Sequence, residues 1–187
     1  MKNKKRLMLA VLGVLLLGSP SALAQESNAF MPKGGKALLI QLLGHPLDTA
    51  ALRQIATSKR NAEEWQTSLA PKTGTMNDRE RRTLSEYLAV NMPLAEKTLA
   101  AAEKQADVAA ALPPDGQELA VNYCQFCHSF FSGYLMVERD VQGWLGTFET
   151  PFHREIEMNA KERETFARYS AINMPMKFED VPEDLRF

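Results

Sequence analysis

Residues 76–93 read MNDRERRTLSEYLAVNMP and residues 158–175 read MNAKERETFARYSAINMP; aligned without a gap, ten of these 18 positions are identical. Each stretch has an Asn that can cap a helix and a Glu three residues later, where a reciprocal capping bond can form. Apolar residues follow at helical spacing, and a proline ends each stretch. The repeat therefore predicts two equivalent helices, over 77–91 and 159–173.

The repeat extends towards the N-terminus of each half. The only two tryptophans, Trp65 and Trp144, precede the repeated stretches by 11 and 14 residues. Gly35 and Gly116 precede the two tryptophans by 30 and 28 residues. This self-similarity predicts a duplicated helical module with about 60–70 residues in each half.

No stretch of the chain shows the alternation of apolar and polar residues that is typical of strands, which favours an all-α fold. Prolines stand between the helical patterns, where helices must begin or end. An Ala-rich, charged segment over 95–112 is expected to link the halves as a helix. The remaining helices are predicted at about 35–44, 47–58, 61–69, 95–111, 116–125 and 138–148.

The first 24 residues have the three parts of a secretory signal: a basic start, an apolar run and Ala22-Leu23-Ala24 as a cleavage pattern. The apolar run is shorter than the roughly 20 residues that a membrane span needs. We therefore expect cleavage after Ala24, export to the periplasm and no membrane anchor in the mature protein. The mature chain would carry 18 basic and 23 acidic residues, a balance that argues against nucleic acid as a partner.

The chain has two cysteines, in the motif Cys124-Gln125-Phe126-Cys127-His128. A C-x-x-C-H motif is typical of covalent haem c attachment, in which two thiols bond one haem and the histidine binds its iron. On a helix, residues three and four apart share a face, so we expect both thiols to reach the same haem. A thioredoxin-like dithiol needs an α/β context, and a structural zinc site needs four ligands, which this chain cannot easily provide.

The stretch LPPDGQELAVNYCQFCHS, followed by Arg139, Trp144 and a capped helix with Tyr169, resembles small class I-type c-type cytochromes over about residues 113–176. The resemblance implies a few helices around one haem, with attachment on the first helix and the second axial ligand on a loop before the last. More faintly, the layout is similar to cytochrome partners of periplasmic molybdenum or quinoprotein dehydrogenases.

The signal pattern, the internal repeat and the resemblance together divide the chain into 1–24 (signal peptide), 25–94 (haem-less cytochrome c-like module), 95–112 (helical linker) and 113–187 (haem-binding cytochrome c module). In the first module, the position that matches Cys124 falls near Leu42-Leu43, and no cysteine is present. We expect that copy to serve packing or the docking of a partner. His45 could reach across as a ligand, but a turn residue beside Pro46 is the simpler interpretation.

The second axial ligand is left open between several residues. Met174 and Met158 have counterparts in Met92 and Met76, in the half without a cysteine motif, so packing explains them better. The interval between Trp144 and the repeated helix is three residues longer in the second half and contains His153, which is the first choice. Met158 is the second choice, Met136, Met174 and Met176 follow, and an open site is the remaining alternative.

Aromatic residues gather around the motif in sequence and are expected to wall the haem: Tyr123, Phe126, Phe130, Phe131, Trp144, Phe148 and Phe152. Arg139 and Trp144 are candidates for hydrogen bonds to the haem propionates, and Arg139 could equally be a surface charge. The acidic residues fall mostly on helix faces and are interpreted as solvated surface.

These observations favour a periplasmic monohaem c-type cytochrome that transfers single electrons to or from a redox partner protein, such as a periplasmic dehydrogenase, and is not itself an enzyme. One alternative is a haem enzyme or sensor with an open iron site, peroxidase-like or gas-binding. Another is a scaffold without haem whose cysteines cycle as a dithiol. A low-spin spectrum of the reduced protein that carbon monoxide does not change would exclude the open iron site. Bound haem without titratable free thiols would exclude the dithiol scaffold.

Overall fold

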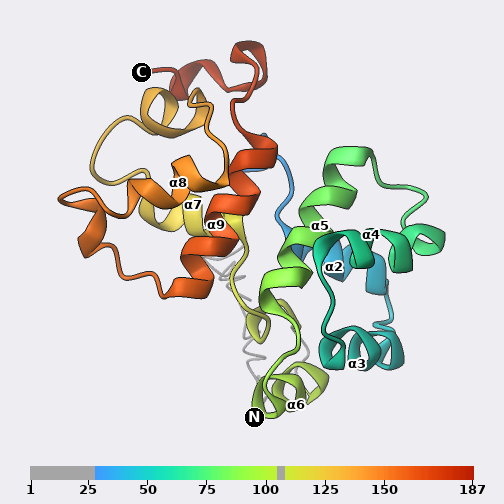
Figure 1. The fold of residues 1–187 in the computed structure, drawn as a ribbon. Helices are drawn as coiled ribbons and strands as arrows, with labels where there is room; N and C mark the ends of the chain where they lie inside the picture. The colour runs from blue at the N-terminus through green and yellow to red at the C-terminus, as the bar shows by residue number, and fades with distance from the viewer. Residues whose placement is uncertain (1–27, 105–107) are drawn as a thin grey trace, which may run out of the picture.

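The structure, a computed structural model, describes residues 28–104 and 108–187, and within these ranges the chain is helical without strands, so the expected all-α fold is confirmed there. Figure 1 shows two lobes, α2 to α6 and α7 to α9, with α5 and α9 side by side between them. The helices are α2 (Gly35–Leu43), α3 (Thr49–Thr57), α4 (Ala62–Leu69), α5 (Asp78–Asn91), α6 (Glu96–Lys104), α7 (Gly116–Tyr123), α8 (Val141–Thr147) and α9 (Ala160–Asn173).

Short helical segments connect these elements. They are η1 (Ala70–Lys72), η2 (Val108–Ala110), the π-helix η3 (Phe131–Leu135), η4 (His153–Glu155), η5 (Phe178–Asp180) and η6 (Glu183–Leu185). The predicted signal, residues 1–24, lies outside the described ranges. Among the helices that are described, none has the length and apolar character needed to cross a bilayer.

The repeated stretches form the two central helices as predicted. Asn77 and Glu80 exchange capping hydrogen bonds of 2.9 Å at the start of α5. Asn159 and Glu162 do the same at the start of α9, at 3.1 and 2.8 Å. Because such caps satisfy backbone N–H groups that have no partner inside the helix, both N-termini begin where the sequence predicts.

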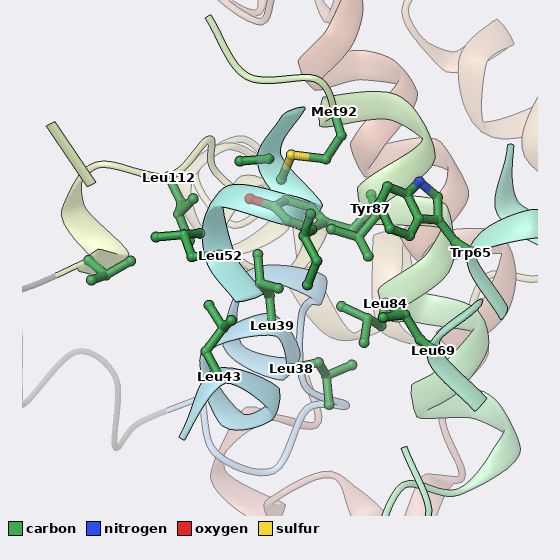
Figure 2. Packing of buried hydrophobic residues seen from close by; sticks show 14 of the residues in the cluster. Leu38, Leu39, Leu43, Leu52, Trp65, Leu69, Leu84, Tyr87, Met92 and Leu112 are labelled. Carbon is green, nitrogen blue, oxygen red and sulfur yellow. The ribbon is translucent and has the colours of Figure 1, made fainter. Parts of the chain in front are cut away.

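The first lobe has a continuous core of buried apolar side chains from α2 to α6 (Figure 2). Trp65 from α4 and Leu84 from α5 pack there with Leu43, which is 3% exposed and lies near the sequence position that matches Cys124 in the repeat. The segment predicted as a linker adds Leu99 and Leu112 to the same core. The described parts of this segment, 95–104 and 108–112, are thus packed on the first lobe.

The second lobe has an aromatic core. α7 and α8 both pack on α9. The ring of Tyr134, from η3, lies 5.4 Å from that of Trp144 and 5.6 Å from that of Phe166. The Tyr134 hydroxyl contacts the Ser170 hydroxyl at 2.9 Å, so the buried phenol has a hydrogen-bond partner.

Equivalent residues of the two lobes make reciprocal contacts across the α5–α9 interface. Asn91 donates to Thr165 Oγ1 and Asn173 donates to Thr83 Oγ1, both at 3.0 Å. Since all four side chains are at most 5% exposed, these hydrogen bonds form inside the interface. Each amide also donates to a backbone carbonyl four residues earlier, which fixes its rotamer.

A second reciprocal pair joins each tyrosine to the chain that enters the other lobe. The Tyr87 hydroxyl donates to the Pro113 carbonyl at 2.8 Å, and the Tyr169 hydroxyl donates to the Pro32 carbonyl at 2.6 Å. Each repeat tyrosine therefore holds the segment that precedes the first helix of the opposite lobe.

Three features differ from the predictions. α7 ends at Tyr123, so the cysteine motif, expected on a helix, runs through bends instead. Within the predicted helix over 95–111, the described residues form α6 and, from Val108 to Ala110, the 3-10 helix η2 instead of an α-helix. Asp115, interpreted with the other acidic residues as solvated, is 2% exposed, because its carboxylate accepts backbone N–H groups of both α7 and α2.

Candidate cofactor site

The second lobe contains a cavity of about 350 Å³ beside the cysteine motif. Cavities that hold cofactors and other small molecules typically measure about 300–1,000 Å³. Its lining is mostly aromatic and apolar, with two thiols and two imidazoles. The lining residues are Tyr123, Cys124, Cys127, His128, Gly133, Tyr134, Trp144, Thr147, Phe148, Phe152, His153, Ile156 and Phe166.

The backbone places the motif at the edge of this cavity. The Cys124 N–H donates to the Ala120 carbonyl at 2.8 Å, which closes the last turn of α7, and the chain then leaves the helix axis. Cys124 is half-buried, whereas Cys127 and His128 are exposed. Both thiols are free. Both cysteines nevertheless line one cavity. The bends therefore bring the two thiols to one site, as was expected of a helix face.

Gly133 lets η3 approach the motif closely. A Cβ at this position would lie 2.3 Å from His128 Nδ1 and 2.4 Å from Cε1. Real Cβ atoms do not approach other atoms so closely, so a side chain here would displace the imidazole. The absence of a side chain at Gly133 is thus a condition for the observed position of His128.

The two imidazoles lie close together although 25 positions separate them in the chain. The ring centroids of His128 and His153 are 6.1 Å apart, with an angle of 54° between the ring planes. Metal–imidazole bonds are about 2 Å long, so two imidazoles on opposite sides of one metal have centroids about 6 Å apart. The observed separation of 6.1 Å therefore matches the distance between two imidazoles that bind one metal from opposite sides.

Each imidazole has a hydrogen-bond partner at Nδ1. His128 Nδ1 lies 3.1 Å from the Ser129 carbonyl, and His153 Nδ1 lies 3.0 Å from Thr150 Oγ1. Metal-binding histidines commonly donate the N–H of the second ring nitrogen to such an oxygen, which orients the ring. This arrangement leaves Nε2 of both rings for a metal.

The candidate methionines lie elsewhere. Met158, Met174 and Met176 are at most 8% exposed and pack in the core of the second lobe, and Met136 packs against it. None of them lines the cavity. Met76 is buried to the same degree as its counterpart Met158, in agreement with the packing role expected from the repeat.

His45 is exposed in the first lobe and does not line the cavity.

Arg139 and Trp144 have different positions relative to the cavity. Trp144 lines it and is 3% exposed, and its Nε1 has no hydrogen-bond partner. Trp65 Nε1 also lacks a partner, so an unpaired indole N–H is common to both lobes and does not by itself indicate a ligand. Arg139 is not part of the lining: its guanidinium lies over the Trp144 ring, 5.5 Å from the centroid, and donates to Thr147 Oγ1 at 2.7 Å.

The expected aromatic wall is formed in part. Tyr123, Trp144, Phe148 and Phe152 line the cavity. Phe131 instead packs edge-on against Phe178, with centroids 5.8 Å apart. Two lining residues, Tyr134 and Phe166, were not expected, because their aromatic character alone does not distinguish them from core residues. The two remaining residues, Phe126 and Phe130, line a second groove that also reaches Cys127 and His128.

The cavity walls affect the chemistry of Cys124. Burial, and secondly the neighbouring Cys127, raise the pKa of the Cys124 thiol to about 12. Reactive cysteines of dithiol redox centres have lowered pKa values, because the thiolate is the nucleophile. The environment of Cys124 is therefore that of an unreactive thiol at neutral pH.

The lining residues fit a haem held through two thioethers. Both thiols, the adjacent imidazole of His128 and the imidazole of His153 border one apolar cavity. Because the porphyrin supplies four iron ligands, such a site needs only axial ligands from the protein. In the part of the chain that the structure describes, no three His, Cys, Asp or Glu side chains converge to hold a metal ion by themselves.

No protein-family model matches this chain, and no curated protein or solved structure is significantly similar to it.

Proposed function

We propose that this protein is a periplasmic monohaem c-type cytochrome that transfers single electrons. The observation that carries the proposal is the convergence of Cys124, Cys127, His128 and His153 on one aromatic cavity. When bound, haem supplies an iron that alternates between its ferric and ferrous states and so exchanges one electron at a time.

In this proposal the protein residues hold the haem and control its surroundings. The S–H groups of Cys124 and Cys127 would each add across one vinyl group of the porphyrin, and His128 would bind the iron through Nε2, since its Nδ1 contacts the Ser129 carbonyl. Trp144 and Phe148, both 3% exposed, keep water from one side of the cavity. A water-poor, apolar surrounding is one of the protein's means of adjusting a haem potential.

We further propose that the two lobes are copies of one cytochrome c-like module, the first of which lacks haem. The reciprocal Asn–Thr and Tyr–carbonyl hydrogen bonds support this, because equivalent residues make equivalent contacts in both directions. Trp65 and Leu84 correspond to Trp144 and Phe166. The first pair packs among leucines (Figure 2), whereas the second pair lines the cavity.

An exposed edge of the proposed haem site offers an approach for a redox partner protein. Phe126 and Phe187 are 75% and 78% exposed and border the second groove, which shares Cys127 and His128 with the cavity. Large exposed apolar side chains that lie together often mark protein contacts. We propose that a periplasmic dehydrogenase or another electron donor or acceptor approaches here.

The dithiol alternative has less support, since the raised pKa of Cys124 opposes thiolate chemistry. The open-site alternative requires that His153 stay off the iron, although this imidazole lines the same cavity as His128, with the two ring centroids 6.1 Å apart.

The test is expression of the whole chain with export and haem-attachment machinery, followed by intact mass, a pyridine haemochrome spectrum and a potentiometric titration. We expect the mass of one added haem, a spectrum of two saturated vinyl groups and a one-electron transition. A Cys124→Ala/Cys127→Ala variant should lose covalent haem, whereas the matched His45→Ala control should keep it. Exported wild-type protein without added porphyrin would refute the proposal.

A further inference from the structure

The loop between α8 and α9 contains a chain of two hydrogen bonds that ends at His153. Thr150 Oγ1 donates to the Thr147 carbonyl at 2.7 Å, and the same oxygen lies 3.0 Å from His153 Nδ1. A threonine hydroxyl has one proton to donate and two lone pairs that accept. Because its proton is directed at the Thr147 carbonyl, the Thr150 oxygen can only accept from the imidazole.

This arrangement determines the tautomer of a neutral His153. Nδ1 must carry the proton that Thr150 accepts, so Nε2 keeps its lone pair. The opposite tautomer would place an unprotonated Nδ1 against an oxygen whose proton is already used, and one of the two hydrogen bonds would be lost. A neutral imidazole with a free Nε2 is the form that binds a metal.

The loop backbone around His153 is held firmly. Phe152 has a φ of +68°, which is unfavourable for a residue with a side chain and persists only where the surrounding structure enforces it. The His153 N–H donates to the Pro151 carbonyl at 2.9 Å, and Arg163 of α9 donates to the Arg154 and Ile156 carbonyls at 3.2 Å. Hydrogen bonds from α9 thus hold the loop immediately after His153.

We propose that Thr150 is the positioning residue of the second axial ligand: it holds His153 as the Nδ1–H tautomer, which leaves Nε2 unprotonated and able to bind the iron. This inference rests on the proposed function, since it concerns the haem of that site. A second imidazole in place of a methionine also implies a lower reduction potential.

The experiment uses the whole haem-loaded chain and compares Thr150→Val, which removes the hydroxyl, with Thr150→Ser, which keeps it. Ferric spectra and carbon monoxide titrations of the ferrous form are recorded, because carbon monoxide must displace His153. Loss of such an outer hydrogen bond weakens metal binding by about 10- to 100-fold. We therefore expect Thr150→Val to bind carbon monoxide about 10- to 100-fold more tightly than wild type, and Thr150→Ser to bind it as wild type does.

Two further variants make the result specific. His153→Ala should give a high-spin iron that binds carbon monoxide readily. Thr73→Val removes a buried threonine hydroxyl in the first lobe, which donates to the Leu69 carbonyl at 3.2 Å, and should leave the haem spectra unchanged. Thr150→Ala replaces Thr150→Val if the latter does not accumulate.

The outcomes separate this inference from the proposed function. Wild-type protein without covalent haem would overturn both. A haem-loaded His153→Ala protein that stays low-spin and unreactive to carbon monoxide would overturn the ligand assignment alone. Equal carbon monoxide affinity in Thr150→Val and Thr150→Ser would show that Thr150 does not position His153.

Discussion

Substitution of Gly116 by Ala tests whether α7, which leads directly into the cysteine motif, depends on close contact with α9. Gly116 is the first residue of α7 and is buried. A Cβ at this position would lie 2.1 Å from Tyr169 Cβ and 2.5 Å from Cγ. Tyr169 cannot easily move away, since it is 3% exposed and its hydroxyl is bonded to the Pro32 carbonyl.

The expected cost follows from this geometry. Ordinary contact begins at 3.4 Å, so α7 and the Tyr169 side chain must separate by about 1.3 Å. An additional methyl group in a packed core costs about 1–3 kcal/mol, and we expect the upper end because the obstructing Cβ is fixed to the α9 backbone. For a chain of this size, a loss of about 3 kcal/mol lowers the melting temperature by about 6–12 °C.

The measurement is thermal unfolding of the haem-loaded protein, followed by circular dichroism and by haem absorbance. Gly146→Ala in α8 is the matched control, since a Cβ there meets no atom within 4 Å. Alanine favours a helix over glycine by about 1 kcal/mol, so the control should be neutral or stabilising. A melting temperature of Gly116→Ala within about 2 °C of wild type would refute the argument that this contact is rigid.

Three further predictions concern Asn173, the two cysteines and Met174. Asn173→Ala removes hydrogen bonds to Thr83 Oγ1 and to the Tyr169 carbonyl and should lower the free energy of unfolding in urea by about 1–3 kcal/mol; an unchanged midpoint would contradict the interface described above. In protein made without haem, the raised pKa of Cys124 predicts that iodoacetamide at pH 8 modifies the exposed Cys127 first. Cys124 should react only as the pH rises towards 12. Peptide mass spectrometry measures the order of modification, and earlier reaction of Cys124 would contradict the prediction. Met174→Leu should keep the absorption spectrum and reduction potential of the haem-loaded protein, since Met174 packs in the core outside the cavity; a high-spin spectrum would instead identify Met174 as the iron ligand.

The helices could be predicted from the sequence because their ends are determined locally. Asn77 with Glu80, and Asn159 with Glu162, are capping pairs within four residues, and the prolines that stop α5 and α9 act through their own backbone. Cys124 and Cys127 are only three residues apart, so the motif alone predicted that both thiols would reach one site. This held even though the chain bends there instead of continuing as a helix.

Other features of the site depend on contacts between distant segments. Nothing local marks Tyr134 as a wall of the cavity, because its position depends on η3 lying against α9. Thr150 has no recognisable motif, and its importance is evident only from the distance of its hydroxyl to His153. The position of Arg139 behind Trp144 likewise depends on the stacking of the guanidinium on the indole, which spacing in the sequence does not reveal.

Asp115 shows why the two lobes are complementary and not interchangeable. Its Oδ1 accepts the Glu118 N–H at the start of α7, while its Oδ2 accepts the Lys36 N–H at the start of α2, at 3.1 Å each. The matching position of the first lobe is Gly34, where a Cβ would lie 2.0 Å from the Asp115 carboxylate. One aspartate therefore caps both helices, and a second at Gly34 would add a clash and an unpaired buried charge. In the proposed duplication, the haem-less lobe thus has its first helix, α2, capped by a residue of the haem-bearing lobe. The N–H groups of α2 also hold the Asp115 carboxylate at the start of α7, the helix that leads to Cys124.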